Sequence, residues 1–326
     1  MVYSSRAGKN QTKILITGAS GFIGRSLVVH LLKRGHNIIS VSRSPTGFNN
    51  SMNSASVESI NSETDLSDKL IEVSTIIHLA ARVHEVRDRS VDVLEAYRLV
   101  NVEGTRGLAE QAASAGVKHF IFLSTVKVYG SCSEPLRPFT HESKTKPMDA
   151  YSQSKLEAEQ ALRAIEKTTD MTVTIIRSPL VYGPGVRANF LEMMRWISLG
   201  IPLPLGALTS NLRSFVGINN LTDFIAVCVN NSKAAGQTFL VSDGKDISTV
   251  ELIRLVAHAM GKKEKLFNVP VWLLEIITKL VNRTKEFERL SDSLQVDISY
   301  SVDRLNWVPV EPLDQAIRHA VQSFRR

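Results

Sequence analysis

Short apolar runs alternate along the first half of the chain with segments in which apolar residues recur every three or four positions. Five runs have the length and composition of buried strands, at residues 13–18, 37–42, 75–81, 118–125 and 171–177. Three segments have helical spacing, at residues 22–34, about 90–115 and 151–168. Strands that alternate with helices are typical of βαβ units. The pattern therefore predicts an α/β fold with a doubly wound parallel sheet and helices on both faces.

Two polar segments stand outside this alternation. Residues 44–61 are rich in Ser and Asn and nearly free of large apolar side chains, which predicts a mobile surface loop. Residues 1–12 are polar and lack the apolar core of a secretory signal, so we expect a flexible leader.

The pattern becomes irregular and richer in proline after about residue 178. We therefore expect two domains, as the soft prior for 326 residues also suggests. The first spans residues 13–178 with parts of 213–245, and the second, smaller one takes most of 179–326. Within the second, residues 270–281 are apolar on more than one face, which favours a core helix over a contact with a membrane surface.

Composition excludes several classes of protein. Hydrophobic residues make up 43% and charged residues 22% of the chain, which is ordinary for a globular protein and rules out wholesale disorder. Cys132 and Cys228 lie far apart, so we expect neither a disulfide framework nor structural zinc, and a reducing, cytoplasmic location fits. The histidines show no ligand spacing, so no metal site is expected. No apolar run approaches the roughly 18 residues of a membrane-spanning helix.

The chain is basic, with a formal net charge of +7. Its Lys and Arg residues are scattered, and no run of five or six like charges appears. This distribution argues against nucleic-acid binding and favours a small anionic ligand.

A glycine-rich turn lies between the first strand and the first helix. Gly18, Gly21 and Gly24 have GxxGxxG spacing. In this context the first glycine permits a tight turn, the second lets the backbone approach a pyrophosphate, and the third lets helix and strand pack closely. The N-terminus of the following helix offers N–H groups to phosphate. The turn therefore predicts a dinucleotide-binding site.

The end of the second strand bears on the choice of cofactor. A site for NAD usually has an acidic residue about 20 positions after the glycines, and this chain has none between Gly24 and Glu58. Arg43 stands at that strand end, where a guanidinium suits a 2′-phosphate. We expect NADP(H) ahead of NAD(H), with both open.

Tyr151 and Lys155 open the helix at 151–168 and share one face of it. A nearby ammonium, together with an oxidised nicotinamide, should lower the phenol pKa from its ordinary value near 10, so that Tyr151 can move protons near neutral pH. Ser124 and Thr125 end the fourth predicted apolar run, where a hydroxyl can bond a substrate oxygen. The order of glycine turn, Ser-Thr and YxxxK predicts a proton-transferring active site.

With these features the chain resembles the extended short-chain dehydrogenases/reductases of the nucleotide-sugar epimerase/dehydratase group, from about Lys13 to about Arg318. Besides the glycine turn and YSQSK, the resemblance is carried by Asp65-Leu66, HLAA at 78–81, NVEGT at 101–105, LST at 123–125, VYG at 128–130 and RSPLVYGPG at 177–185. It implies a Rossmann-type NAD(P)-binding domain followed by a smaller domain that binds a nucleotide sugar. It also implies a homodimer formed through the helices at about 90–115 and 151–168.

The resemblance also implies roles for individual residues. Thr125, Tyr151 and Lys155 would be catalytic, with Ser124 in support. Besides Arg43, the residues in contact with the cofactor would be Gly18, Ser20, Gly21, Phe22, Ile23, Gly24, Asp65, Leu66, Leu79, Ala80, Ala81, Asn101, Tyr151 and Lys155. The UDP-sugar would contact Ser124, Tyr151, Asn189, Phe190, Pro204, Leu205 and Arg213, with Arg213 on the diphosphate.

Two positions depart from the dehydratases of the group, which carry an Asp-Glu pair directly after the catalytic Thr. Here these positions are Val126 and Lys127. Neither can supply the acid and base of a dehydration, so we expect none. Lys127 either contacts the sugar or stays in solvent.

Two reactions at C4 of a UDP-sugar remain, and a third class stays open. The absent acidic residue favours an NADPH-dependent reduction of a UDP-4-keto-6-deoxy-hexosamine, as in the bacterial subgroup that forms UDP-N-acetylquinovosamine for surface polysaccharides. The alternative is a 4-epimerase of UDP-glucose or UDP-N-acetylglucosamine. A non-catalytic NADP-binding sensor is the alternative of another class, although such proteins often lack the Tyr or the Lys.

Overall fold

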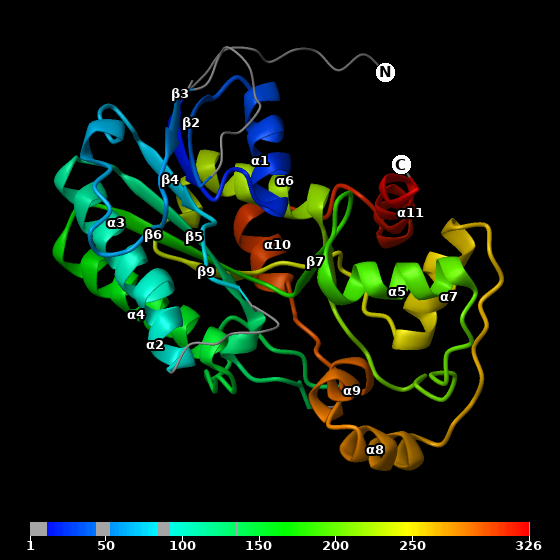
Figure 1. The fold of residues 1–326 in the computed structure, drawn as a ribbon. Coiled ribbons are helices and arrows are strands. Elements are labelled where there is room, and N and C mark those ends of the chain that lie inside the picture. The colour runs from blue at the N-terminus through cyan, green and yellow to red at the C-terminus, as the bar shows by residue number, and fades with distance from the viewer. Residues whose placement is uncertain (1–11, 44–52, 84–91, 135, 326) are drawn as a thin grey trace.

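The computed structural model describes residues 12–43, 53–83, 92–134 and 136–325. It has a layered α/β body, here called the sheet lobe, beside a mainly helical C-terminal lobe (Figure 1). Residues 1–11 of the predicted leader and residues 44–52 of the predicted loop lie outside the described residues.

Seven parallel strands form the sheet, in the order β3-β2-β1-β4-β5-β6-β9. Their bounds are β1 Lys13–Thr17, β2 Asn37–Ser42, β3 Asn53–Ser56, β4 Thr75–His78, β5 His119–Thr125, β6 Thr172–Ser178 and β9 Thr238–Leu240. The chain builds outward from β1 in one direction and then, from β4 on, in the other. Between β1 and β4 lies the switch point, where ligands of such sheets bind beyond the carboxyl ends of the strands.

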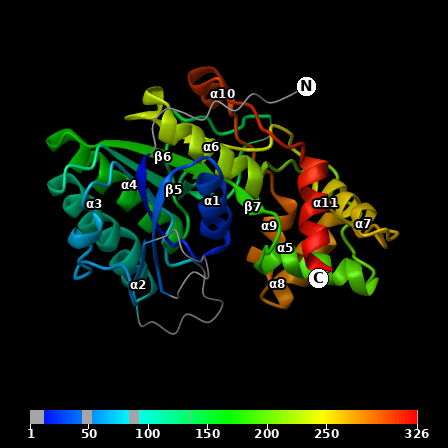
Figure 2. The ribbon, with the colours of Figure 1, turned by 90° about the horizontal axis from the view of Figure 1, so that it is seen from above.

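Helices cover both faces of the sheet, as predicted (Figure 2). One face carries α1 (Phe22–Lys33) and α6 (Ile218–Asn230), which pack on each other. The other carries α2 (Val93–Arg98), α3 (Gly104–Ser114) and α4 (Ala150–Thr168). Apolar residues recur at helical spacing in these helices, so each helix buries one apolar stripe against the sheet. The strands between them are buried in turn, as β1 is almost throughout.

The C-terminal lobe has its own hydrophobic core, which draws buried side chains from Tyr182 to Val321. Its helices are α5 (Ala188–Leu199), α7 (Thr249–Ala259), α8 (Val271–Leu280), α9 (Thr284–Ser291) and α11 (Leu313–Phe324). A two-stranded sheet joins β7 (Leu180–Tyr182) to β8 (Phe215–Gly217). After it the chain returns to the sheet lobe through α6 and β9, and again through α10 (Ser299–Leu305), where Leu305 and Trp307 are buried. The division into two domains at about residue 178 stays a prediction.

Two predicted elements were wrong in detail. Residues 53–56 form the edge strand β3, which pairs with β2 through the backbone, so its Ser and Asn side chains gave no apolar signal. The helix at about 90–115 is interrupted by a π-helical turn, η2 (Leu99–Glu103). Directly after this turn the chain passes close to a neighbouring segment, because a Cβ on Gly104 would lie 2.4 Å from the carbonyl oxygen of Ile60.

The predicted burial of the helix at 270–281 in the core was also wrong. α8 forms there, but Leu274 is its only buried residue. Among the described residues, no helix has both the length and the apolar character needed to cross a membrane. Homodimerisation through the α2–α3 and α4 segments stays a prediction.

Candidate functional site

The glycine turn lies at the switch point and fits a dinucleotide. Gly18 has φ +70°, and a Cβ there would lie 2.8 Å from the amide nitrogen of Ala80, just after β4. A Cβ on Gly24 would lie 2.2 Å from the carbonyl oxygen of Gly18, so α1 can approach the turn only with glycine at this position. Gly21 is exposed and leaves its backbone accessible. The three glycines therefore serve the turn, the ligand approach and the helix packing that the spacing predicts.

The N-terminus of α1 is open to an anion. Its N-cap is Gly21, and within the described residues no side chain caps the helix and no acidic residue occupies its first turn. The first N–H groups of a helix have no partner within the helix, and the helix dipole places partial positive charge there. A pyrophosphate in this position would satisfy both. Ser20, Phe22 and Ile23 are partly exposed around the same turn.

A buried network joins the two strands of the switch point to η2. His78 Nδ1 lies 2.7 Å from Thr17 Oγ1, and its Nε2 lies 3.0 Å from Thr105 Oγ1. Thr105 donates its own hydroxyl hydrogen to the carbonyl of Asn101, so it accepts from Nε2, and Nδ1 accepts from Thr17. Burial, with Lys155 adding to it, lowers the pKa of His78 to about 3, so the ring is neutral. His78 is therefore a structural residue of the site.

Asn101 connects this network to the helix that carries Tyr151. Its amide donates to Ser154 Oγ at 3.0 Å and to the carbonyl of Arg82 at 3.1 Å, and its oxygen accepts from the Arg82 amide at 2.8 Å. Ser154 in turn donates to the carbonyl of Tyr151. In the structure the Asn101 side chain thus holds α4 against the segment after β4, a function that the sequence did not indicate. The cofactor contact predicted for it stays a prediction.

Tyr151 and Lys155 lie on the first two turns of α4. α4 begins with a capping box in which Asp149 and Ser152 each accept from the other's backbone N–H. Tyr151 packs edge-on against Tyr97, with ring centroids 6.1 Å apart. Lys155 is 2% exposed, and its ammonium lies 3.8 Å from the ring centroid of Phe122.

The electrostatics of this pair differ from the expectation. Burial, the carboxylate of Asp149 and the neighbouring Tyr97 raise the pKa of Tyr151 above 10, whereas we expected Lys155 to lower it. Burial lowers the pKa of Lys155 to about 7, and Glu159 opposes that shift. The phenol is therefore protonated in the ligand-free protein. Of the two factors that the sequence suggested, the positive charge of a bound oxidised nicotinamide remains as the one that would lower the pKa of Tyr151.

Ser124 and Thr125 end β5 close to the start of α4. Both are buried, and in the described part of the chain the hydroxyl oxygen of Ser124 has no hydrogen-bond partner. A buried hydroxyl without a partner is costly and points to a ligand oxygen. Thr125 Oγ1 accepts weakly from the amide of Lys127 at 3.3 Å, which leaves its hydrogen available for another acceptor.

Lys127 forms an ion pair with Asp149, in which its ammonium lies 3.0 Å from Asp149 Oδ2. The contact with the sugar predicted for Lys127 stays a prediction. Burial alone would raise the pKa of Asp149, but the Ser152 amide and Lys127 outweigh burial and hold it at about 2. The ion pair joins η3 (Val126–Val128), next to Thr125, to the N-terminus of α4, next to Tyr151.

The other residues predicted for the cofactor surround the same edge of the sheet. Leu79, Ala80 and Ala81 follow β4 and are partly exposed. Arg43 is exposed directly after β2. Asp65 is exposed and accepts from the amide of Ser67, while the amide of Leu66 donates to Gln111 and the Leu66 side chain is buried.

The residues predicted for the nucleotide sugar separate into two groups. Phe190 stacks on Tyr182 with ring centroids 5.4 Å apart, and Leu205 is also buried in the core of the C-terminal lobe. Their side chains therefore build the lobe. Asn189 is exposed at the start of α5, and Pro204 is partly exposed.

Arg213 is partly buried, and its Nη1 donates to the carbonyl of Asp292 at 2.8 Å. Burial lowers the pKa of Arg213, Asp292 raises it, and the nearby Arg289 lowers it further. A guanidinium at this position can bind an anion with two negative charges.

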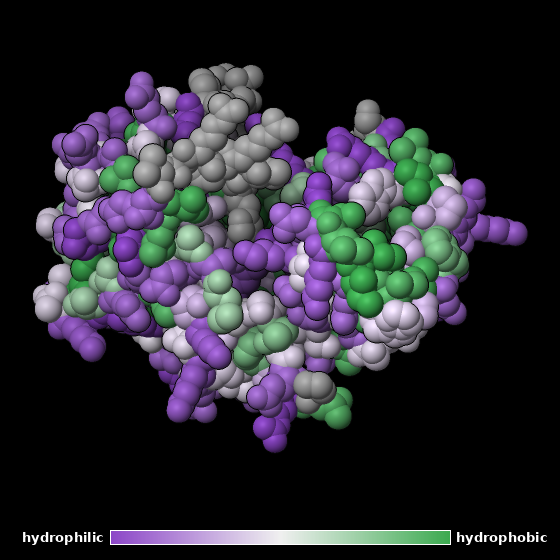
Figure 3. Space-filling view, turned by 60° about the horizontal axis from the view of Figure 1, so that its bottom comes forward, coloured by the Kyte–Doolittle hydropathy of each residue, from purple (hydrophilic) through white to green (hydrophobic). Residues whose placement is uncertain are grey.

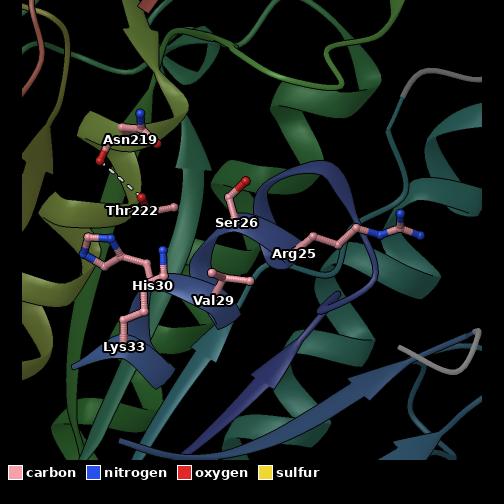
Figure 4. A pocket seen from close by; sticks show the side chains of 7 residues that line it. All are labelled: Arg25, Ser26, Val29, His30, Lys33, Asn219 and Thr222. Atoms are coloured by element: carbon pink, nitrogen blue, oxygen red, sulfur yellow. Dashed lines mark hydrogen bonds between the residues drawn. The ribbon is translucent and has the colours of Figure 1, made fainter. Parts of the chain in front are cut away.

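A hollow of about 340 Å³ lies elsewhere, between α1 and α6 (Figure 4). Its wall includes His30 and Lys33 of α1, and Asn219 and Thr222 of α6, which bond each other. None of the residues predicted for cofactor or substrate lines it. Among the described residues, no cluster of three or more His, Cys, Asp or Glu side chains is arranged to hold a metal ion.

Comparisons with known proteins agree with this geometry. The sequence profile of the NAD dependent epimerase/dehydratase family matches residues 14–242. A UDP-glucose 4-epimerase of Vibrio cholerae is 42% identical over 317 residues, which cover 97% of this chain and 96% of the relative. An N-acetyl-alpha-D-glucosaminyl-diphospho-ditrans,octacis-undecaprenol 4-epimerase of Escherichia coli O157:H7 is 29% identical over 79% of this chain and 75% of its own length.

Solved structures share the fold. The UDP-glucuronic acid 4-epimerase of Bacillus cereus, in complex with NAD, superposes with a TM-score of 0.78 over 96% of this chain and 99% of its own. The identity is 22%, so this likeness concerns the fold. It supports the doubly wound sheet and the attached lobe as a shared architecture.

Proposed function

Since the chain belongs to the NAD-dependent epimerase/dehydratase family, within the extended short-chain dehydrogenases/reductases, we propose that it interconverts the C4 epimers of a UDP-sugar with bound NAD. The observation that carries the proposal is the meeting of four groups at one edge of the sheet. These are the glycine turn, the unpartnered hydroxyl of Ser124, Thr125, and the Tyr151–Lys155 pair. The similarity to the Vibrio cholerae enzyme over nearly the whole of both chains supports the substrate class.

The same residues argue against a dehydration. An elimination needs an acid and a base beside the reacting carbons. Val126 is buried and apolar, and Lys127 is held by Asp149. The chain therefore has side chains that can move a proton at O4. At positions 126 and 127 it lacks the acid/base pair with which the dehydratases of the family remove water.

In the proposed mechanism Thr125 and Ser124 hold the C4 oxygen of the sugar, and Tyr151 takes the proton from that oxygen. Lys155, on the same face of α4 as Tyr151, would hold the nicotinamide ribose. Bound NAD would supply the acceptor for the hydride of C4 and, once reduced, its donor. The resulting 4-keto sugar turns its other face to the site while Arg213 holds its diphosphate. Tyr151 then gives its proton back to O4 as hydride returns to C4, so atoms and electrons balance without a second substrate.

A reduction of a UDP-4-keto-6-deoxy-hexosamine, with NADPH consumed, is the second candidate. Arg43 favours it, because this exposed guanidinium follows β2 where an acidic residue would bind the ribose of NAD. The solved relatives hold NAD, so the comparisons do not support the preference for NADP. We therefore place epimerisation first.

The test is product analysis with the purified protein. UDP-glucose and UDP-N-acetylglucosamine are incubated separately, without added cofactor, and the sugars are resolved by chromatography and NMR. We expect one of them to reach equilibrium with its C4 epimer. Stoichiometric loss of absorbance at 340 nm with NADPH and UDP-4-keto-6-deoxy-N-acetylglucosamine, without epimerisation, would establish the reductase instead. Cofactor binding without turnover of any of these sugars would indicate a sensor.

The Lys127–Asp149 ion pair yields a prediction on pH dependence. In Lys127→Met the carboxylate of Asp149 loses its counter-charge, so the pKa of Tyr151, already raised by burial, Asp149 and Tyr97, rises further. A higher phenol pKa means less phenolate at a given pH. We expect the rising limb of the kcat/KM profile to move up by about one pH unit.

Two variants give this experiment its controls. Lys146→Met removes an exposed charge three positions before Asp149 and should leave the profile unchanged. Asp149→Asn in the Lys127→Met background keeps an N-cap but removes the carboxylate, and it should return the limb toward the wild-type position. An unshifted limb in Lys127→Met would show that the ion pair does not act on Tyr151.

A further inference from the structure

α8 presents most of its apolar side chains to solvent. Of its ten residues only Leu274 is buried. Trp272 is 62%, Ile276 47%, Ile277 44% and Leu280 81% exposed. A surface helix normally turns such residues toward the core, so this orientation is the reverse of the usual one.

These side chains form one continuous strip, here called the α8 face and defined as Trp272, Ile276, Ile277 and Leu280. The first, second and last are four positions apart, so they follow one line along the helix, and Ile277 lies beside it. Figure 3 shows a hydrophobic patch on the C-terminal lobe, which carries α8. A contiguous apolar patch on a surface marks a place of interaction.

The surroundings of the α8 face are basic. Between the end of α7 and the start of α9, residues 260–283 hold five basic residues and two acidic ones, a net charge of +3. All seven are exposed: Lys262, Lys263, Lys265, Lys279 and Arg283, with Glu264 and Glu275. Lys279 lies one turn after Ile276 on the edge of the strip. Charge of this sign complements an anionic surface.

The dimensions of the face argue against a second copy of the chain as its occupant. A helix of ten residues is about 15 Å long and about 10 Å wide, a footprint of about 150 Å². A stable interface of standard size buries about 800 Å² per partner. A symmetric pair would also bring the basic residues of two chains together. A flat, fluid surface requires neither a large area nor shape complementarity.

We propose that the α8 face docks the protein on the surface of an anionic lipid bilayer. Trp272 would lie at the level of the headgroups, where its amphipathic ring is favoured. Ile276, Ile277 and Leu280 would enter the boundary of the acyl chains, with the helix axis parallel to the membrane. Lys279 and Arg283 would contact the phosphates. The protein would then act at the membrane surface without crossing it. This inference concerns location and does not depend on the reaction proposed above.

The test is co-flotation of the full chain with vesicles. Vesicles of phosphatidylcholine mixed with phosphatidylglycerol are compared with vesicles of phosphatidylcholine alone. We expect binding to the anionic vesicles, weakened by salt. The double variant Ile276→Glu/Leu280→Glu should lower the vesicle partition coefficient at least about tenfold. Lys279→Gln/Arg283→Gln should weaken binding to the anionic vesicles and leave any binding to vesicles of pure phosphatidylcholine unchanged.

A matched control adds the same two charges elsewhere. Val308 and Val310 are 64% and 58% exposed, outside α8 and the proposed active site. Val308→Glu/Val310→Glu should therefore float as the wild type does. A blue shift of tryptophan emission on adding anionic vesicles, absent from Trp272→Phe, would place the α8 face at the lipid. Thermal melting and NAD binding of each variant verify the fold.

Three results would overturn the proposal. In the first, the wild type floats with no vesicle. In the second, the Ile276→Glu/Leu280→Glu variant floats as well as the wild type. In the third, the wild type binds no lipid but forms a dimer that this variant converts to monomer. The last result would assign the face to a second copy.

Discussion

Replacing Tyr151 with phenylalanine is expected to lower kcat for C4 epimerisation at least about 100-fold, the usual scale for a positioned acid or base. Phenylalanine keeps the ring that packs against Tyr97 and removes only the hydroxyl that exchanges its proton with O4. Binding of NAD and of the UDP-sugar should change little, because the loss concerns the proton in the transition state. The measurement is steady-state turnover together with NAD affinity.

Tyr300→Phe is the matched control for this variant. It removes a partly buried phenol whose hydroxyl bonds Gln237, outside the proposed site. Its turnover should stay close to that of the wild type. A Tyr151→Phe enzyme that keeps turnover within about threefold of the wild type would remove Tyr151 from the chemistry.

Replacing Lys155 with methionine should also lower kcat at least about 100-fold, and it should weaken NAD as well. Lys155 is 2% exposed above the ring of Phe122, and methionine can occupy this apolar space without a charge. Glu159, which raises the pKa of Lys155, is held by the buried guanidinium of Arg177 at 2.5 Å. Glu159 thus opposes the lowering of the Lys155 pKa by burial and favours the charged ammonium.

The control is Lys167→Met, at the exposed end of the same helix. It should leave both turnover and NAD affinity unchanged. A Lys155→Met enzyme with full activity, or one in which only the melting temperature falls, would make Lys155 a residue of stability. The joint effect on turnover and cofactor affinity separates this prediction from that for Tyr151.

The parts of the fold that depend on local pattern were predictable from the sequence. β1, the glycine turn and α1 follow from an apolar run, the glycine spacing and a helical repeat within about 20 residues. The start of α4 was clear from the helical repeat that begins at YSQSK. Because each of these signals is local, periodicity and spacing are enough to detect it.

Other parts depend on contacts between distant segments. β3 is a strand because its backbone pairs with β2, and its Ser and Asn side chains carry no signal of that. The apolar repeat of α8 was visible, but which face it buries depends on the surrounding lobe. Lys127 and Asp149 are 22 positions apart, so only the packing of η3 on α4 reveals their ion pair. The raised pKa of Tyr151 likewise follows from burial, which spacing does not measure.

The central claim is that hydride leaves C4 and returns to the same carbon within one bound complex. The direct measurement uses the UDP-sugar that is turned over, carrying deuterium at C4, without added cofactor. Mass spectrometry and NMR then follow the label in the product. We predict an epimer that retains deuterium at C4, with no net change in absorbance at 340 nm after turnover. An epimer that carries hydrogen from solvent at C4, or a product formed only with stoichiometric consumption of NADPH, would contradict the claim.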